Sequence, residues 1–290
     1  MTKLKAFWYS TRPKTLWASA FPVISSFLLA LKQKLENPSL SLPIFLGLGA
    51  SCLIIAILAQ IISNFINDAN DYEKNRDILR TQALRPIHKG EITSLDLKRG
   101  AKVLVALTLI FGSFIFIFGY HRFVNIFLAA SIFLGAYGYS QGRFAFSLRG
   151  LGEVAAFVFF GPVAFFGTLG VLYPQEQLLF FLPKGLLLSS LWGLMSVFLM
   201  MANNYRDYNE DFQVSKKTLA VIMGPTYYKF LGLFLLCFFE FCLALIFWPL
   251  CLCSLFLFLF LPIPLFPKIL FHHLSIGLLV FLVQLYDIFK

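Results

Sequence analysis

Charged residues are scarce in this chain of 290 residues. Only 13% are Asp, Glu, Lys or Arg, whereas 59% are hydrophobic and 36 are phenylalanine. A soluble domain carries about twice that share of charge and needs far fewer apolar residues to fill one core. The composition therefore excludes an ordinary soluble enzyme and indicates an integral membrane protein.

Several residue patterns that mark catalytic sites are also missing. The five cysteines lie inside apolar runs, without a C-x-x-C pair or a histidine at metal-ligand spacing, which is typical of small buried residues. Among the four histidines, His88 lies in a basic loop, where it could contact an anion or simply be solvated. No serine or cysteine has the surroundings of a catalytic nucleophile. The basic start is followed by Pro13 and polar residues, which argues against a cleaved signal peptide.

Long apolar runs are what the chain has in abundance. A helix needs roughly 20 residues to cross a hydrocarbon layer of about 30 Å, and nine runs approach that length. We expect helices, because an open sheet edge cannot satisfy its backbone groups in lipid. Four prolines between residues 249 and 267 divide the last three runs. The expected spans are residues 14–32, 42–66, 101–120, 123–140, 153–173, 181–203, 226–247, 249–267 and 272–289.

The basic residues are distributed unevenly between the two ends of these spans. If the N-terminus is cytoplasmic, 19 of the 24 Lys and Arg lie in cytoplasmic segments. This bias follows the positive-inside rule and supports an odd number of spans with the N-terminus inside, in the cell (inner) membrane. Topology explains most of the net charge of +10, although the same charges could also recruit anionic substrates or lipids.

Only two connections are long and polar, residues 67–100 and 203–225, and both are cytoplasmic by this count. Each follows an apolar run that ends in asparagine and aspartate. The two junctions align at an offset of 139 residues, which pairs Asn64 with Asn203, Asp68 with Asp207, Asn70 with Asn209, and Asp71 with Glu210. Two related helix groups facing each other across a shared central cavity would produce such an internal repeat.

Each junction places its polar residues on one side of a helix. At 100° per residue, Asn64, Asp68, Asp71 and Asn75 form one narrow stripe. A continued helix would do the same for the second set, which is Asn203, Asp207, Glu210 and Asp211. Like charges on one face repel, and a carboxylate within the membrane costs roughly 2.5 to 3.5 kcal/mol, so both stripes require a partner.

Mg²⁺ is the partner that these groups favour. It prefers oxygen ligands and is commonly held by one or two carboxylates together with substrate phosphates. A diphosphate bridging the stripes could be completed by nearby cations, namely Arg76, Arg80, Arg85 and Lys89 in the first loop and Arg206, Lys216 and Lys217 in the second. The alternative is that the acids and bases merely pair with one another at a wet surface.

These motifs resemble the UbiA-type intramembrane aromatic prenyltransferases. The resemblance is carried by RPKTLWASAFPV (12–23), NFINDANDYEKNRD (64–77), RGLGEVAAFVFFGPVAFFGTLGV (149–171) and NNYRDYNEDFQVSKKTLAVIMG (203–224). Within that family they are most similar to the branch that prenylates 1,4-dihydroxy-2-naphthoate in menaquinone biosynthesis. The resemblance implies an all-α membrane protein of about nine helices around a central cavity, capped by two cytoplasmic polar loops, with residues 1–290 as one transmembrane prenyltransferase domain.

The resemblance also implies a reaction and a set of site residues. A polyprenyl group would pass from its diphosphate to an aromatic acid acceptor, with loss of pyrophosphate and CO₂ and with Mg²⁺ as cofactor. The catalytic residues implied are Asp68, Asp71, Asp207 and Asp211. The metal ligands implied are Asn64, Asp68, Asp71, Asp77, Asn203, Asp207 and Asp211. The substrate-binding residues implied are Asn67, Arg85, Lys216, Lys217, Arg12, Tyr139 and Arg149.

The sequence departs from the family pattern in two places. Position 75, often glycine in this branch, is Asn75, and Asp77 falls on the opposite side of an ideal helix from Asn64, so Asp77 can bind metal only if the helix ends before it. The stretch at residues 137–148 lacks an expected glycine-proline run. This second departure leaves the details of the acceptor site open.

Other functions remain possible from the residues alone. The acceptor could instead be 4-hydroxybenzoate or homogentisate, since the loops and not the aspartates decide it. A cation-coupled transporter would place charges near several helix midpoints, whereas Glu240 is the clearest isolated acid of that kind here. A structural or lipid-binding protein would not require paired stripes. Nothing in the pattern favours a nucleic-acid partner.

Overall fold

The computed structural model describes residues 1–36, 40–74, 85–138, 145–260, 280 and 283–284. All regular secondary structure in these ranges is helical, which agrees with the expected all-α class. The elements in chain order are α1 (Lys3–Ser10), η1 (Pro13–Thr15), α2 (Trp17–Glu36), α3 (Leu42–Glu73), α4 (Ser94–Phe118), α5 (Arg122–Gly138), η2 (Phe146–Leu148), α6 (Gly152–Val158), η3 (Phe159–Val163), α7 (Ala164–Leu172), α8 (Gln175–Arg206), α9 (Tyr208–Gln213) and α10 (Leu219–Phe260).

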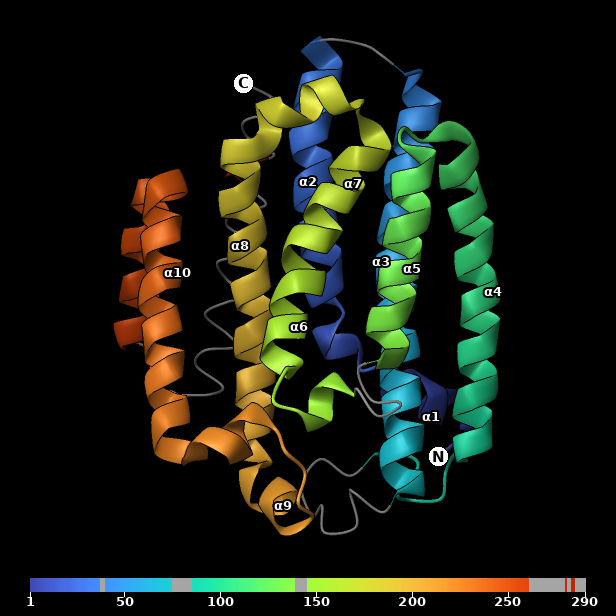
Figure 1. The fold of residues 1–290 in the computed structure, drawn as a ribbon, viewed down its shortest axis with the longest axis vertical. Coiled ribbons are helices and arrows are strands. Elements are labelled where there is room, and N and C mark those ends of the chain that lie inside the picture. Colours follow the sequence, from blue (N-terminus) through green and yellow to red (C-terminus); the bar gives the residue numbers. More distant parts are fainter. Residues whose placement is uncertain (37–39, 75–84, 139–144, 261–279, 281–282, 285–290) are drawn as a thin grey trace.

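The described helices form an elongated bundle of the kind expected in a membrane (Figure 1). Within the described residues, five helical stretches are long and apolar enough to cross a bilayer, and the bent pair formed by α1–η1 and α2 raises that number to six. A further apolar helix, Leu128–Gly138, is shorter. The protein is therefore an integral membrane protein.

The expected spans agree with the helices along most of the chain. The first seven runs each overlap a helix, with residues 153–173 covered by the consecutive elements α6, η3 and α7. The expected division before residues 249–267 is not observed, because α10 continues across Pro249 to Phe260. Proline is tolerated within membrane helices because neighbouring helices and local adjustments satisfy the freed carbonyl. The ninth run lies outside the described residues apart from three positions, so the count of nine stays a prediction.

The centre of the bundle is an apolar core shared by α2, α3, α7, α8 and α10. Two buried hydrogen bonds tie α2 to α7: Ser26 Oγ donates to the Phe165 carbonyl at 2.7 Å, and the Tyr173 hydroxyl donates to the Ala30 carbonyl at 2.8 Å. Polar groups inside a membrane require such partners because lipid offers none. These bonds fix the first half of the chain against the helices that follow.

The segment from α6 to α7 packs against α8 with very close backbone approach. A Cβ at Gly161 would lie 2.6 Å from the Ser189 carbonyl oxygen, and one at Gly193 would lie 2.8 Å from the Phe157 oxygen. Small residues permit such contacts between membrane helices. Pro162 lies in the π-helical element η3 at this contact, which is how the chain passes a proline without ending the span.

Large aromatic side chains cover part of the outer surface. Phe230, Phe234 and Phe241 on α10 are each at least 60% exposed. α10 lies at the edge of the bundle beside α8 (Figure 1). In a membrane protein, an exposed apolar surface of this kind is expected to face lipid.

Candidate active site

The first set of predicted ligands lies at the end of α3. This helix is apolar for most of its length and continues without a break to Glu73, so the stripe from Asn64 to Asp71 is helical as expected. Asp68 and Asp71, each 1% exposed, form what we call the first acidic row. Asn67 is also buried and donates from Nδ2 to Asp71 Oδ2 at 3.3 Å, an i to i+4 contact that orients this carboxylate.

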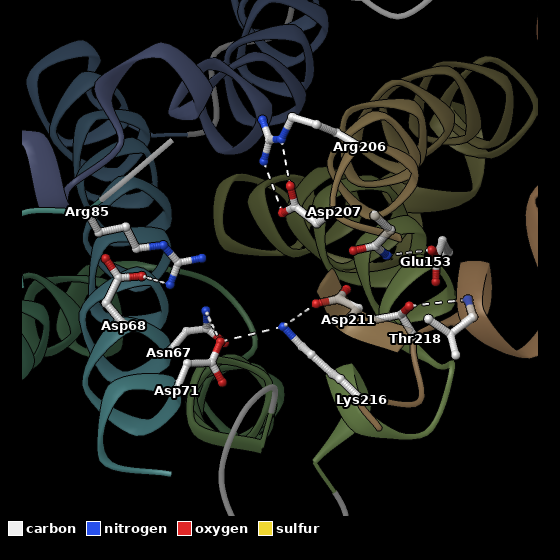
Figure 2. Close-up of polar contacts among 12 residues, drawn as sticks. Asn67, Asp68, Asp71, Arg85, Glu153, Arg206, Asp207, Asp211, Lys216 and Thr218 are labelled. Atoms are coloured by element: carbon white, nitrogen blue, oxygen red, sulfur yellow. Dashed lines mark hydrogen bonds and ion pairs between the residues drawn. The ribbon is translucent and has the colours of Figure 1, made fainter. Parts of the chain in front are cut away.

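Asp68 accepts from two guanidinium groups through the same oxygen. Arg85 Nη1 lies 2.5 Å from Asp68 Oδ1, and Arg12 Nη2 also donates to it. Charge-assisted hydrogen bonds of this kind are short and strong, and they stabilise a carboxylate that burial alone would disfavour. Figure 2 shows the Arg85 side chain extending to Asp68 beside α3.

Arg12 reaches this position because the chain turns sharply between α1 and α2. The two helical parts meet at 55°, and Arg12 has left-handed backbone angles, φ 55° and ψ 58°. Such a conformation costs a non-glycine residue about 1 to 3 kcal/mol. The ring of Phe7 packs against that of Phe65, with centroids 5.8 Å apart and the ring planes tilted by 51°, and holds α1 against α3. The ion pair with Asp68 offsets part of the strain.

Arg85 is positioned by the apolar residues that follow it. Ile87 and Ile92 are buried in a second apolar cluster with Phe65, Ala69 and other residues of α1, α3 and α4. This cluster anchors the segment after residue 84 against the end of α3. A basic side chain that would otherwise be solvated is therefore directed toward the first acidic row.

The second set of ligands lies where α8 gives way to α9. Helical periodicity predicted one continued helix for the second set, which is Asn203, Asp207, Glu210 and Asp211. In the structure α8 ends at Arg206 and α9 begins at Tyr208. Asp207, at φ −87° and ψ 6°, caps both helices. The Asp211 amide still donates to the Asp207 carbonyl at 2.9 Å, which keeps both residues on one side. Asp207 and Asp211, both buried, form the second acidic row.

The two rows lie at the same end of the bundle and are joined by one cation. α3 and α8 both terminate at the end marked by α9 and the N-terminus (Figure 1). Lys216 Nζ lies 3.6 Å from Asp71 Oδ2 and 3.7 Å from Asp211 Oδ1, with its side chain 10% exposed (Figure 2). Its amide donates to the Asp211 carbonyl at 2.9 Å, and the preceding Ser215 adopts φ 55°. The expected facing arrangement is therefore present.

The donor set suits a hard divalent cation. Four buried carboxylates line this end of the bundle, and a positive group already lies between Asp71 and Asp211. Carboxylate and carboxamide oxygens are the ligands that Mg²⁺ prefers, usually only one or two from the protein with the rest from water and phosphate. In the described part of the chain, no three His, Cys, Asp or Glu residues gather into one ready-made metal cage. This pattern fits a site completed by a phosphate-bearing ligand.

Several other predicted residues occupy less central positions. Asn64 donates from Nδ2 to the Thr11 carbonyl at 3.0 Å, which leaves its side-chain oxygen available. Asn203 is half-buried at the end of α8, whereas Lys217 and Arg149 are exposed. Predictions for Asp77, Asn75 and Tyr139 fall outside the described residues.

One buried carboxylate was not among the site residues predicted from the sequence. Glu153, at the start of α6, accepts from Asn204 Nδ2 at 2.8 Å and from the Tyr228 hydroxyl at 2.5 Å. An acidic residue at the edge of a membrane span, here residues 153–173, is a signal of a functional residue. Helix periodicity around the aspartates, however, could not show that Glu153 lies near them.

The family follows from the match of the whole chain. The model of the UbiA prenyltransferase family matches residues 19–283. The chain belongs to this family. It is a prenyltransferase, and the two acidic rows lie in the parts of the chain whose motifs carried the resemblance.

Relatives of known name support the same branch of the UbiA family. The chain is 31% identical over 229 residues to the 1,4-dihydroxy-2-naphthoate octaprenyltransferase of Haemophilus influenzae, covering 77% of this chain and 70% of the relative. The identity and the coverage are the same for the enzyme of that name from Escherichia coli K12. The fold resembles a UbiA homologue from Archaeoglobus fulgidus bound to DMAPP and Mg²⁺, with a TM-score of 0.58, 15% identity, and coverage of 98% and 85% of the two chains.

Proposed function

We propose that this prenyltransferase transfers a polyprenyl group from a polyprenyl diphosphate to 1,4-dihydroxy-2-naphthoate, with loss of pyrophosphate and CO₂, giving demethylmenaquinol, the reduced form of demethylmenaquinone. The observation that carries the proposal is the contact of Lys216 with both Asp71 and Asp211, which brings two buried acidic rows to one site. The names of the relatives from Haemophilus influenzae and Escherichia coli support the choice of acceptor.

The proposed metal ligands are the oxygens of the two rows and of their neighbouring asparagines. Asn64, Asp68 and Asp71 would hold one Mg²⁺, and Asn203, Asp207 and Asp211 the other, with Asp77 as a possible further ligand. Bound there, Mg²⁺ would offset the charge of the diphosphate and so make it a better leaving group. The Mg²⁺ in the Archaeoglobus fulgidus homologue supports this cofactor.

The basic side chains around the rows have a second task. Arg85 and Lys216, which contact the carboxylates here, are also within reach of a diphosphate lying between the rows, and Lys217 and Asn67 would add contacts at its edge. Arg12 is better assigned to orienting Asp68 than to the acceptor, because its guanidinium donates to that carboxylate. Tyr139 and Arg149 remain the proposed acceptor contacts.

The chemistry requires no protein nucleophile. The allylic carbon–oxygen bond breaks and its electron pair leaves with the pyrophosphate. An electron pair of the ring forms the new carbon–carbon bond at the carbon that bears the carboxylate. The carbon–carboxylate bond then breaks, CO₂ departs, and its electrons restore the aromatic ring. The chain's task is to hold the diphosphate, exclude water from the allylic cation and place the ring beside it.

The proposed location is the cell (inner) membrane, with the N-terminus and both acidic rows at the cytoplasmic face. The distribution of Lys and Arg supports this orientation. A cytoplasmic site would receive a water-soluble aromatic acid directly, while the prenyl chain enters from the bilayer.

The test is product analysis with purified protein. Mass spectrometry should detect demethylmenaquinol, or the quinone that air oxidation forms from it, when polyprenyl diphosphate, 1,4-dihydroxy-2-naphthoate and Mg²⁺ are supplied, and no prenylated product when EDTA removes the metal. Parallel reactions with 4-hydroxybenzoate and homogentisate decide the acceptor. Prenylation of either of these in preference to the naphthoate would overturn the assignment within the family.

A further inference from the structure

Glu153 is a carboxylate held deep between three helices. It lies in the first turn of α6 and is 5% exposed. Its Oε1 accepts from Asn204 on α8 and from Tyr228 on α10, the latter being 1% exposed. Its position near the helix N-terminus and its two donors both stabilise this buried acid.

The second oxygen of Glu153 has no partner in the structure. Oε2 is inaccessible to solvent and makes no hydrogen bond. Leaving a buried acceptor unsatisfied is costly, more so for a charged group, and native structures rarely do so without a reason. In Figure 2, one oxygen of Glu153 takes part in a dashed contact and the other does not. The free oxygen is thus fixed in direction by the bonds of its neighbour.

This group lies beside the second acidic row but does not belong to it. Asn204, its donor, directly follows Asn203 on α8, and Figure 2 shows Glu153 on the same side of the site as Asp207 and Asp211. The donors to Glu153 are the neutral side chains of Asn204 and Tyr228, whereas Asp68 and Asp211 contact Arg85 and Lys216. Glu153 is therefore held by neutral donors, unlike the aspartates of the rows.

The charge and the hydrogen-bond donors of each reactant indicate which of them Oε2 can bind. The diphosphate is an anion that a carboxylate repels, and the prenyl chain has no hydrogen-bond donor. Among the reactants of the function proposed above, only the aromatic acceptor carries O–H groups. We propose that Glu153 Oε2 accepts a hydrogen bond from a ring hydroxyl of the acceptor. That bond orients the ring and raises its electron density, and so favours its attack on the allylic carbon.

The informative variant is Glu153→Gln. The glutamine oxygen can still accept from Asn204 and Tyr228, while its NH₂ group replaces Oε2 and offers a donor where an acceptor is needed. Because hydrogen bonds to charged groups are among the stronger ones, we expect the KM for the acceptor to rise about 10- to 100-fold. The KM for polyprenyl diphosphate and the unfolding temperature should stay within about twofold and a few degrees of the parent values.

Tyr228→Phe is the matched control, because it removes one donor to Oε1 and leaves Oε2 unchanged. A purely structural Glu153 predicts that both variants lose stability together and affect both substrates alike. The proposal predicts that only Glu153→Gln weakens the acceptor selectively. Equal behaviour of the two variants overturns it.

Binding measured by calorimetry supplies a readout independent of turnover. Wild-type protein should bind 1,4-dihydroxy-2-naphthoate more tightly than the methyl ether in which a ring hydroxyl is methylated. Glu153→Gln should bind the two compounds about equally. If Glu153→Gln still binds the naphthoate more tightly than the methyl ether, another residue contacts the hydroxyl and the inference is overturned. If wild-type protein prenylates no aromatic acid at all, the proposed function fails first, and product analysis detects that outcome separately.

Discussion

The two acidic rows look alike in sequence but are neutralised differently. In the first row, Asp68 is 1% exposed and accepts from Arg12 and Arg85, which reach it from distant segments of the chain. In the second row, Asp207 pairs with its own neighbour Arg206, with Nε 2.7 Å from Oδ1, and that arginine side chain is 42% exposed. The cations that contact Asp68 come from distant segments, whereas Arg206 is the sequence neighbour of Asp207.

This difference implies a division of labour. Arg12 and Arg85 join the turn after α1 and the segment after residue 84 to the end of α3, so Asp68 helps to assemble this end of the bundle. Asp207 lies at the junction of α8 and α9, next to its partner Arg206. We infer that the first row contributes to both stability and chemistry, and the second mainly to chemistry.

Alanine substitution of one aspartate from each row gives the largest expected effects. Asp68→Ala and Asp207→Ala should each reduce prenyl transfer by about 1,000-fold or more, since losing one group that stabilises developing charge already costs about 100- to 1,000-fold. Initial rates of product formation at saturating Mg²⁺ provide the measurement. Retained Mg²⁺-dependent turnover in either variant contradicts the proposed two-row site.

Stability should separate the same two variants. Asp68→Ala removes a carboxylate from two partly buried guanidinium groups, a change of the kind that costs about 3 to 5 kcal/mol. Asp207→Ala breaks a pair with an exposed arginine, worth about 1 kcal/mol or less. Thermal unfolding in detergent should therefore show a large decrease for Asp68→Ala and a small one for Asp207→Ala. Equal decreases would remove the distinction between the rows.

Lys216 tests whether the rows act as one unit. Lys216→Ala removes the cation that contacts Asp71 and Asp211, and we expect prenyl transfer to fall about 10- to 100-fold, mainly through weaker binding of the diphosphate. The exposed neighbour provides the comparison, because Lys217→Ala should reduce the rate only about two- to threefold. Steady-state kinetics with varied polyprenyl diphosphate distinguish the two, and a larger effect at Lys217 would reverse the assignment.

Local patterns in the sequence predicted the elements that local forces determine. Apolar length gave the main helices, and a period of 3.6 residues placed Asp68 and Asp71 on one side of α3, because that helix continues to Glu73. At the second row α8 ends at Arg206, yet the Asp211 amide still donates to the Asp207 carbonyl and the two residues stay on one side. The sequence there has no glycine or proline to signal the end of α8.

Contacts between distant segments could not be predicted in this way. The resemblance implied a substrate-binding role for Arg12 but not its contact with Asp68, which lies 56 positions along the chain. That contact depends on a left-handed turn that no glycine marks. The partners of Glu153 on α8 and α10 lie still further away. Such pairings arise from helix packing, and a single sequence contains no record of which helices meet.

The smallest expected effect concerns an acid that lies just outside the first row. Glu73 ends α3 two residues after Asp71, but it is 45% exposed and pairs with Lys98 at 2.7 Å. Exposed ion pairs contribute about 0 to 1 kcal/mol, so Glu73→Gln should leave the rate and the Mg²⁺ requirement unchanged and the unfolding temperature within about 2 °C. Assays of rate against Mg²⁺ concentration check this. A shifted Mg²⁺ dependence would mean that negative charge near the helix end, and not the buried position of Asp68 and Asp71, sets the metal site.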